Sequence, residues 1–332
     1  MEPLFVFKGY KMKEFKTIDE QIEKLKTRGL LFQDEHDAKS KLLRYGYYEI
    51  VNGYKEFILK EKDRFIEGET FEHLFSLFNL DMNLQKEVMD ATKRFEMLVK
   101  TALAYHLSDK YGHLESDYLK RTNFKSGKKK NGKYQIDKLL ETFQNVINDE
   151  NEPFYHYKHN KNHTPAWILL KGVTLGSLRI FYQLQKSDIK EKVIRTVLGI
   201  PSSIILDDDT KHMFSTILYL SHKFRNRAAH NGRIFSYNPK YNDSPFISSF
   251  HNKIHITREM FNSGYGKNDL YTFVSYLSNI DDLNIYTTLI VGINFYVKKH
   301  LDIYPNDKQL LLKNMGVPEN IISSFRNNYD IF

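Results

Sequence analysis

The chain has 332 residues, enough to bury a sizeable core in one large domain or in two or three small ones. It contains no cysteine, which excludes a disulfide framework, a thiolate nucleophile and a thiolate metal site, and fits a reducing cytoplasm. The formal net charge of +8 favours a polyanionic partner.

Two targeting features are not expected. No run of apolar residues approaches the ~18 that a membrane span requires. The stretch from Met1 to Lys16 has scattered charges and no uninterrupted apolar segment, so we expect no signal peptide and a cytoplasmic protein.

Residues 1–80 form an N-terminal segment that we expect to be helical and aromatic. Thr17-Ile18-Asp19-Glu20 has the form of a capping box, and it predicts a helix that stops near Gly29. A second helix is predicted through Asp37–Leu43, ending at Gly46. A bend punctuated by glycine then carries four tyrosines, Tyr45, Tyr47, Tyr48 and Tyr54. Packing is the simpler interpretation of these tyrosines, and RNA stacking is the alternative.

Apolar residues then repeat at helical spacing from Phe71 to Phe78, and again from Leu84 to Leu103. The second run predicts a long core helix over Met82–Tyr111. Beside its apolar stripe, Glu96 and Lys100 stand one turn apart. An ion pair between them is the simpler interpretation, and a supporting role for Glu96 near a functional site is the alternative.

The segment 121–134 interrupts the helical pattern with two glycines and a dense run of lysines, and predicts a mobile cationic loop. Such runs are usually solvated, but lysines close to Phe124 and Tyr134 also suit contact with a phosphate backbone. The candidate RNA-binding residues are Lys125, Lys128, Lys129, Lys130 and Lys133, with Arg233 farther along the chain.

The middle of the chain gives no metal or cofactor signature. His156, His159 and His163 lie close together in a stretch that we expect to be irregular, 154–163, without a cysteine or a paired His-Glu-x-x-His helix, so we expect no metal and no cofactor. Trp167, the only tryptophan, is expected to face the core, and Gly176 to permit close helix packing. Residues 237–256 are predicted to be a loop, with short strands within it as the alternative. Further helices are predicted at 136–147, 188–198, 270–277, 283–297, 308–312 and 318–325.

An amphipathic run over Asp208–Asn231 carries the most distinctive pattern. Its start is acidic, which suits the helix dipole, and Asn231-Gly232 predicts its end. At ~100° per residue, five side chains fall within one arc of about 140°: His222, Arg225, Asn226, Ala229 and His230.

These residue types suit chemistry on a phosphodiester. Imidazole exchanges protons near neutral pH, a guanidinium binds phosphate oxygens, and an amide orients its neighbours. The alternative is a helix cap with a solvated polar face.

Arg225-Asn226, three intervening residues and His230 resemble the signature of HEPN-domain ribonucleases. An ordered series of further motifs between Asp37 and Tyr237 resembles the Abi-like proteins of bacterial abortive infection, the AbiD/AbiF group. These motifs are Leu43-Arg44-Tyr45-Gly46-Tyr47-Tyr48, Asn52-Gly53-Tyr54, Arg94-Phe95-Glu96, Pro165-Ala166-Trp167, Leu175-Gly176-Ser177-Leu178, Leu198-Gly199-Ile200-Pro201 and Ala229-His230.

The resemblance implies an all-α fold: a HEPN-like helical bundle at 81–236, with helical additions at 1–80 and 237–332. It also implies a metal-independent endoribonuclease in which the substrate's own 2′-hydroxyl attacks the phosphate. His230 would move a proton, Arg225 would stabilise charge and Asn226 would position groups, with His222 and Glu96 as supporting residues.

One motif per chain implies a homodimer with a composite site. RNA is the expected substrate, and a small structured non-coding RNA is an expected inhibitor. The alternative function is a catalytically silent RNA-binding or toxin–antitoxin protein that retains the HEPN fold.

Overall fold

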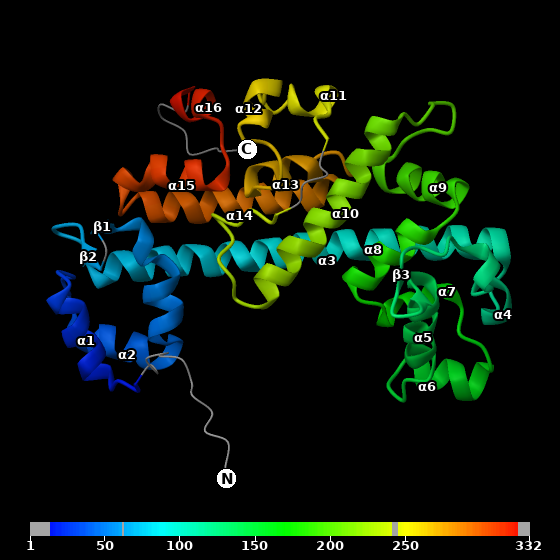
Figure 1. Ribbon diagram of the computed structural model, residues 1–332, viewed down its shortest axis with the longest axis horizontal. Coiled ribbons are helices and arrows are strands. Elements are labelled where there is room, and N and C mark those ends of the chain that lie inside the picture. Colours follow the sequence, from blue (N-terminus) through cyan, green and yellow to red (C-terminus); the bar gives the residue numbers. More distant parts are fainter. Residues whose placement is uncertain (1–13, 62, 241–244, 325–332) are drawn as a thin grey trace, which may run out of the picture. The chain divides into compact units, whose positions relative to one another are not determined.

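A computed structural model describes residues 14–61, 63–240 and 245–324 (Figure 1). The fold is all-α, as predicted, and strands occur in the described ranges only as two short antiparallel hairpins. The chain divides into two compact units, Met1–Leu80 and Asp81–Phe332. Most of the stretch in which we expect no signal peptide lies outside the described residues.

The unit boundary falls within one long helix, α3 (Phe71–Tyr111). The predicted start of this helix at Met82 is wrong, because the two apolar runs belong to a single helix. No glycine or proline lies between Phe78 and Leu84, so the sequence between the runs contains nothing that ends a helix.

The core of the second unit is built around α10 (Asp208–Ala229), which packs against α8 (Leu175–Leu184), α9 (Ser187–Leu198) and α13 (Leu270–Leu277) and crosses α3 (Figure 1). Its aromatic residues make these contacts. The ring centroid of Phe214 lies 6.5 Å from that of Phe95 on α3, and Phe224 stacks on Phe273 of α13 at 4.5 Å. The motif helix is therefore held on several sides by apolar packing.

A second group of elements follows α3. They are α4 (Glu115–Tyr118), η3 (Arg121–Asn123), β3 (Lys129–Lys130), β4 (Lys133–Tyr134), α5 (Gln135–Ile147), α6 (Phe154–His156), η4 (Tyr157–Lys161), α7 (Ala166–Leu169) and η5 (Leu170–Gly172). Short helical turns occupy most of 154–163, so the prediction of an irregular stretch there is wrong.

The lysine-rich segment is also more ordered than a loop. β3 and β4 form a hairpin in which Lys130 pairs with Lys133. The cations of Arg121 and Lys129 lie 5.6 and 5.3 Å from the centroid of the Tyr134 ring. Contact between cations and an aromatic face stabilises this arrangement although the segment has no apolar periodicity.

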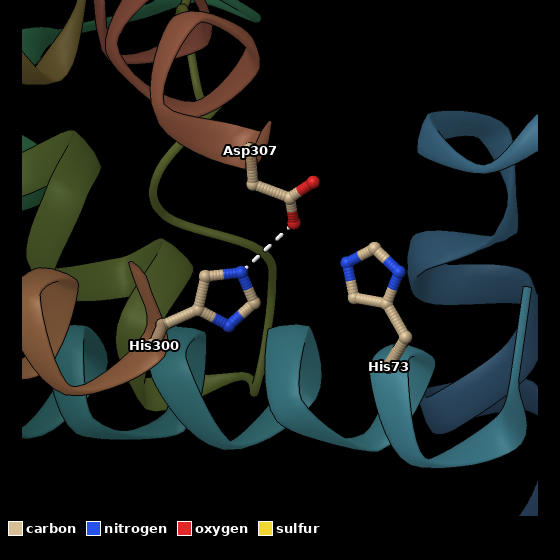
Figure 2. Close-up of side chains that lie close together, drawn as sticks. All are labelled: His73, His300 and Asp307. Atoms are coloured by element: carbon tan, nitrogen blue, oxygen red, sulfur yellow. Dashed lines mark hydrogen bonds and ion pairs between the residues drawn. The ribbon is translucent and has the colours of Figure 1, made fainter. Parts of the chain in front are cut away.

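The C-terminal part of the second unit is helical. Two short helices, α11 (Ser248–His251) and α12 (Arg258–Asn262), were not predicted, and α11 replaces part of the expected 237–256 loop, of which 241–244 lie outside the described residues. Then come α14 (Leu283–Leu301), η6 (Pro305–Asp307), α15 (Lys308–Met315) and α16 (Glu319–Ser324). Figure 2 shows one buried polar contact here, between His300 Nε2 and Asp307 Oδ2 at 2.9 Å.

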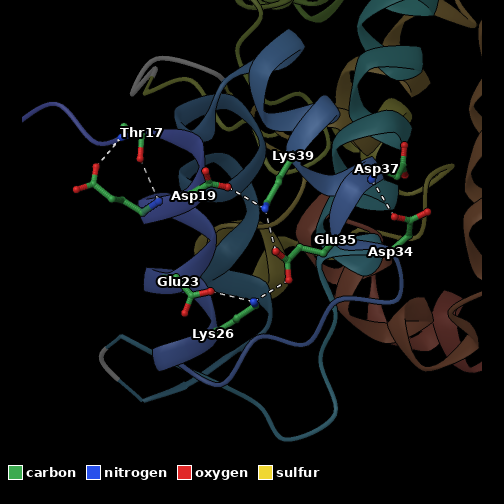
Figure 3. A network of polar contacts seen from close by, with 9 residues as sticks. Thr17, Asp19, Glu23, Lys26, Asp34, Glu35, Asp37 and Lys39 are labelled. Atoms are coloured by element: carbon green, nitrogen blue, oxygen red, sulfur yellow. Dashed lines mark hydrogen bonds and ion pairs between the residues drawn. The ribbon is translucent and has the colours of Figure 1, made fainter.

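In the first unit, α1 (Ile18–Thr27) begins at the predicted capping box. The Thr17 side chain accepts a hydrogen bond from the Glu20 amide, and the Glu20 carboxylate accepts one from the Thr17 amide. The second helix, α2 (Glu35–Tyr45), ends at Gly46, whose φ of 85° favours glycine. Figure 3 shows the ion pairs that join the two helices, Lys39 of α2 with Asp19 of α1 and Glu35 of α2 with Lys26 of α1.

The remaining elements of the first unit are η1 (Tyr48–Asn52), η2 (Lys55–Phe57), β1 (Leu59–Glu61) and β2 (Arg64–Phe65). Tyr45 and Tyr54 pack on Phe78, with ring centroids 5.3 and 6.1 Å apart, which confirms the packing interpretation for these two tyrosines. Tyr48 is 70% exposed and does not belong to the core. No helix in the described part of the chain combines the length and apolarity needed to cross a membrane.

Candidate functional site

The predicted motif lies at the C-terminal end of α10, where the chain makes a tight stop. His230 is the C-cap residue, and Asn231 adopts a left-handed conformation with φ of 52°. The amides of Asn231 and Gly232 donate to the carbonyl oxygens of Ala228 and Arg227 at 3.1 and 2.8 Å. This is the Schellman arrangement, and asparagine tolerates the left-handed position that it requires.

A buried carboxylate holds the chain just beyond this stop. Asp81 of α3 is fully buried, and its Oδ1 accepts hydrogen bonds from the amides of Ile234 and Phe235 at 2.8 and 3.0 Å. Its Oδ2 accepts a bond from Gln85 at 3.1 Å. The exit from the motif is therefore fixed to α3 by side-chain groups more than 140 residues away in the sequence.

The structure brings three of the predicted site residues together. The side-chain nitrogen Nδ2 of Asn226 donates to Nε2 of His222 at 3.0 Å, and the side-chain oxygen Oδ1 of Asn226 accepts a bond from the Arg225 guanidinium at 3.2 Å. Both polar atoms of the Asn226 side chain are therefore hydrogen-bonded. Asn226 contacts both of its polar neighbours, and the positioning role that the resemblance implies stays a prediction.

His222 is a neutral imidazole in this arrangement. Burial, followed by the charges of Arg179, Lys223 and Arg225, lowers its pKa from 6.5 to about 4. Because Nε2 accepts from Asn226, the ring proton resides on Nδ1, which is buried and has no hydrogen-bond partner in the described chain. A neutral ring with so low a pKa is a poor proton donor near neutral pH.

Close packing on α8 fixes the position of the His222 ring. A Cβ atom added at Gly176 would lie 2.9 Å from His222 Nε2, closer than such contacts allow. Glycine at this position therefore lets the imidazole lie against the α8 backbone, which confirms the prediction that Gly176 permits close packing.

His230 differs from its neighbours in the motif. It is exposed, and none of the described residues forms a hydrogen bond with its imidazole. Asn226 and His230 lie one turn apart, and the backbone amide of His230 donates to the backbone carbonyl of Asn226 at 3.2 Å. The imidazole is thus available to a ligand.

The lysine-rich hairpin lies beside α8. A pocket of about 400 Å³ is lined by cations of the hairpin segment and of α5, together with Ser177 and Ile180 of α8. The cations are Lys128, Lys130, Lys133 and Lys138. All four are exposed, and Lys133 also pairs with Glu141 at 2.6 Å. Since Gly176 of the same helix contacts His222, α8 connects this pocket with the motif.

The other candidate residues are placed as follows. Lys125 is exposed, Lys129 lies over Tyr134, and neither lines the pocket. The Arg233 guanidinium is 5.8 Å from the centroid of the Phe235 ring. Glu96 forms an ion pair with Lys100 at 2.7 Å, which confirms the simpler interpretation of that pair. A supporting role for Glu96 stays a prediction.

Sequence reasoning missed two residues that shape the site. Asp81 fixes the chain beyond His230, and Arg179 of α8 adds positive charge beside His222. Arg179 follows the Leu175–Leu178 motif directly, but helical spacing alone does not indicate which neighbouring helix it approaches. Its guanidinium lies 5.8 Å from the ring centroid of Tyr219 on α10.

Comparison with known proteins adds one finding. Neither the curated proteins nor the solved structures contain a match to this chain. A family model described as Abi-like protein matches residues 40–236, which include the motif, α8 and the lysine-rich hairpin. The chain therefore belongs to the Abi-like protein family.

Proposed function

We propose that the chain is a metal-independent endoribonuclease of the HEPN type that acts in abortive infection. Membership of the Abi-like family suggests the abortive-infection function. The observation that favours ribonuclease chemistry is the exposed His230 imidazole, one helical turn from an Asn226 amide held by His222 and Arg225.

In this proposal the 2′-hydroxyl of the RNA attacks the adjacent phosphorus, forming a 2′,3′-cyclic phosphate and releasing the 5′-oxygen. The His230 imidazole removes the 2′ proton or protonates the leaving oxygen. Arg225 stabilises the negative charge that develops on the phosphate. The cations of Arg179 and Lys223 beside His222 add to the attraction for an anionic substrate.

The reaction requires both a base and an acid, and one chain supplies one suitable imidazole. His222 is an unsuitable second donor because its pKa is about 4. Two chains related by a two-fold axis would bring two His230 side chains to one phosphate, so the proposal includes a homodimer with a composite site.

The exposed Ala229 lies within the same arc and leaves room for a partner helix. We expect Ala229→Trp to dissociate the dimer and to reduce cleavage in proportion to the monomer fraction, as measured by light scattering and by RNA cleavage. Asp209→Trp, exposed at the other end of α10, is the matched control and should remain dimeric. A wild-type protein that cleaves RNA as a monomer would contradict the composite site.

The test of activity compares wild type with His230→Ala on RNA in EDTA. We expect the variant to lose cleavage while its thermal unfolding is unchanged, because truncating an exposed side chain has little effect on stability, within about 0.5 kcal/mol. His212→Ala is the control, since His212 is an exposed histidine in the first half of the same helix. Cleavage by His230→Ala at the wild-type rate would refute the assignment.

A catalytically silent RNA-binding protein is the second candidate, and the lysine-lined pocket favours it. Such a protein would bind RNA with strong salt dependence and leave it intact. A small structured RNA that inhibits the protein is part of both proposals. Extracting nucleic acid from the purified protein tests for such a partner.

A further inference from the structure

A groove of about 910 Å³ follows the surface of α3 in the second unit and is bounded by α7 and η5. Three large apolar or aromatic side chains on its walls are exposed to solvent: Met97 by 61%, Tyr105 by 66% and Trp167 by 47%. The prediction that Trp167 faces the core is therefore wrong. Its helix, α7, is only four residues long, and the buried neighbours Ala166, Ile168 and Leu169 attach it to the core instead.

The charges around this groove are unbalanced. Four cations line it, Lys93, Arg94, Lys100 and Lys171, against two carboxylates, Asp90 and Glu96. The carboxylates pair with Arg94 at 2.8 Å and with Lys100 at 2.7 Å. Lys93 and Lys171 are exposed and have no carboxylate partner within the described ranges. These two lysines are therefore available to bind an anionic ligand.

We propose that this groove binds a single-stranded segment of RNA, with unpaired bases stacked on Trp167 and Tyr105 and phosphates held by Lys93 and Lys171. Aromatic faces beside a cationic groove are what single strands require, because every base has a face that stacks and every nucleotide carries a phosphate. Duplex RNA keeps its bases stacked inside the helix, so it cannot use the aromatic faces in this way.

The dimensions agree with a short single strand. From Asp90 to Tyr105 the groove follows about 22 Å of helix, taking 1.5 Å per residue. About six stacked nucleotides cover that length at ~3.4 Å each. Tyr105 also lines an adjoining hollow of about 420 Å³, where Lys192 pairs with Asp109 at 3.1 Å.

A second copy of the chain is the competing occupant. The centres of stable protein interfaces are depleted in lysine and other charges. Here six charged side chains line the same groove as the aromatic residues, which favours a polyanion. The inference goes beyond the proposed cleavage reaction, because binding in this groove requires neither His230 nor a 2′-hydroxyl.

The single tryptophan provides a direct measurement. The probe is a 2′-O-methyl oligouridylate of about 12 nucleotides, within the range of known single-strand sites. It cannot be cleaved through 2′-hydroxyl attack, so binding is measured whether or not the protein is a ribonuclease. We expect the oligonucleotide to quench Trp167 fluorescence saturably, and its duplex with oligoadenylate to bind much more weakly.

Variants are compared through the anisotropy of a labelled oligonucleotide. Tyr105→Ala and Trp167→Ala should each weaken binding by ~5- to ~150-fold, the effect of losing one base stack. Lys93→Gln and Lys171→Gln should each lower the salt slope by about 0.7. Phe295→Ala is the control, because Phe295 is 60% exposed on α14 outside the groove and should bind as wild type does.

Three results would overturn the proposal: no quenching, equal binding of the duplex, or wild-type affinity in Tyr105→Ala. If Tyr105→Ala and Trp167→Ala instead convert a dimer to a monomer and leave oligonucleotide binding unchanged, the groove is a self-association surface. Tyr105 is more exposed than Trp167, so its variant remains informative if Trp167→Ala does not fold.

Discussion

The role of Asp81 in holding the end of the motif leads to a quantitative prediction. Its carboxylate accepts two backbone bonds, from Ile234 and Phe235, both in fully buried residues. Asp81→Ala leaves both amides without an acceptor. Each unsatisfied buried amide costs about 1–3 kcal/mol, so we expect the free energy of unfolding of the second unit to fall by about 2–6 kcal/mol.

Asp81→Asn is the matched variant. A carboxamide oxygen can still accept both backbone bonds, while the charge is lost and the contact with Gln85 changes. We expect a loss of about 1 kcal/mol, the net worth of a typical hydrogen bond. Urea unfolding followed by Trp167 fluorescence measures both variants, because the only tryptophan lies in the same unit as Asp81.

His212→Ala serves as the surface control, because His212 is exposed on α10, and it should lie within about 0.5 kcal/mol of wild type. If Asp81→Ala unfolds at the same urea concentration as wild type, the claim that this carboxylate fixes the chain after His230 is refuted. Equal losses in Asp81→Ala and Asp81→Asn would show that the charge matters, and not the acceptor.

Three further outcomes are expected. Gly176→Ala should slow RNA cleavage without unfolding the protein, because the new Cβ displaces the His222 nitrogen that bonds Asn226; wild-type rates would refute this. The folded pKa of His222, about 4, lies below its unfolded value of 6.5, so the unfolded chain binds an extra proton between these values and stability falls as pH drops from 6.5 to 4. For this half-exposed ring the loss should be about 1–2 kcal/mol after discounting for solvent, and His222→Gln should show a flatter pH dependence in urea unfolding at pH 7 and pH 5. The lysines of the hairpin pocket are Lys128, Lys130, Lys133 and Lys138. Replacing them by glutamine should lower the salt slope of RNA binding by about 0.7 per lost phosphate contact. An unchanged slope would show that these lysines are solvated and do not contact RNA.

The sequence predicted those features of the site that depend on near neighbours. The acidic start of α10 and the stop at Asn231-Gly232 follow from capping chemistry within one helical turn, and both are observed. The close approach at Gly176 was also predictable, because only glycine lacks a side chain there.

What the sequence could not predict depends on contacts between distant segments. The bond from Asp81 to Ile234 spans 153 residues, and no periodic pattern indicates it. The exposure of Trp167 depends on which face of a four-residue helix is buried, and an apolar residue alone does not determine that. The lysine-rich hairpin was missed because cation–aromatic contacts, not alternating apolar residues, stabilise it.

The most direct measurement of the proposed chemistry is the identity of the RNA ends produced in EDTA, determined by mass spectrometry. We expect wild-type protein to yield 2′,3′-cyclic phosphate and 5′-hydroxyl ends, and a substrate with a 2′-deoxy nucleotide at the cleaved position to remain intact. Cleavage that requires added metal, or that produces 5′-phosphate ends, would contradict attack by the 2′-hydroxyl at the motif of α10.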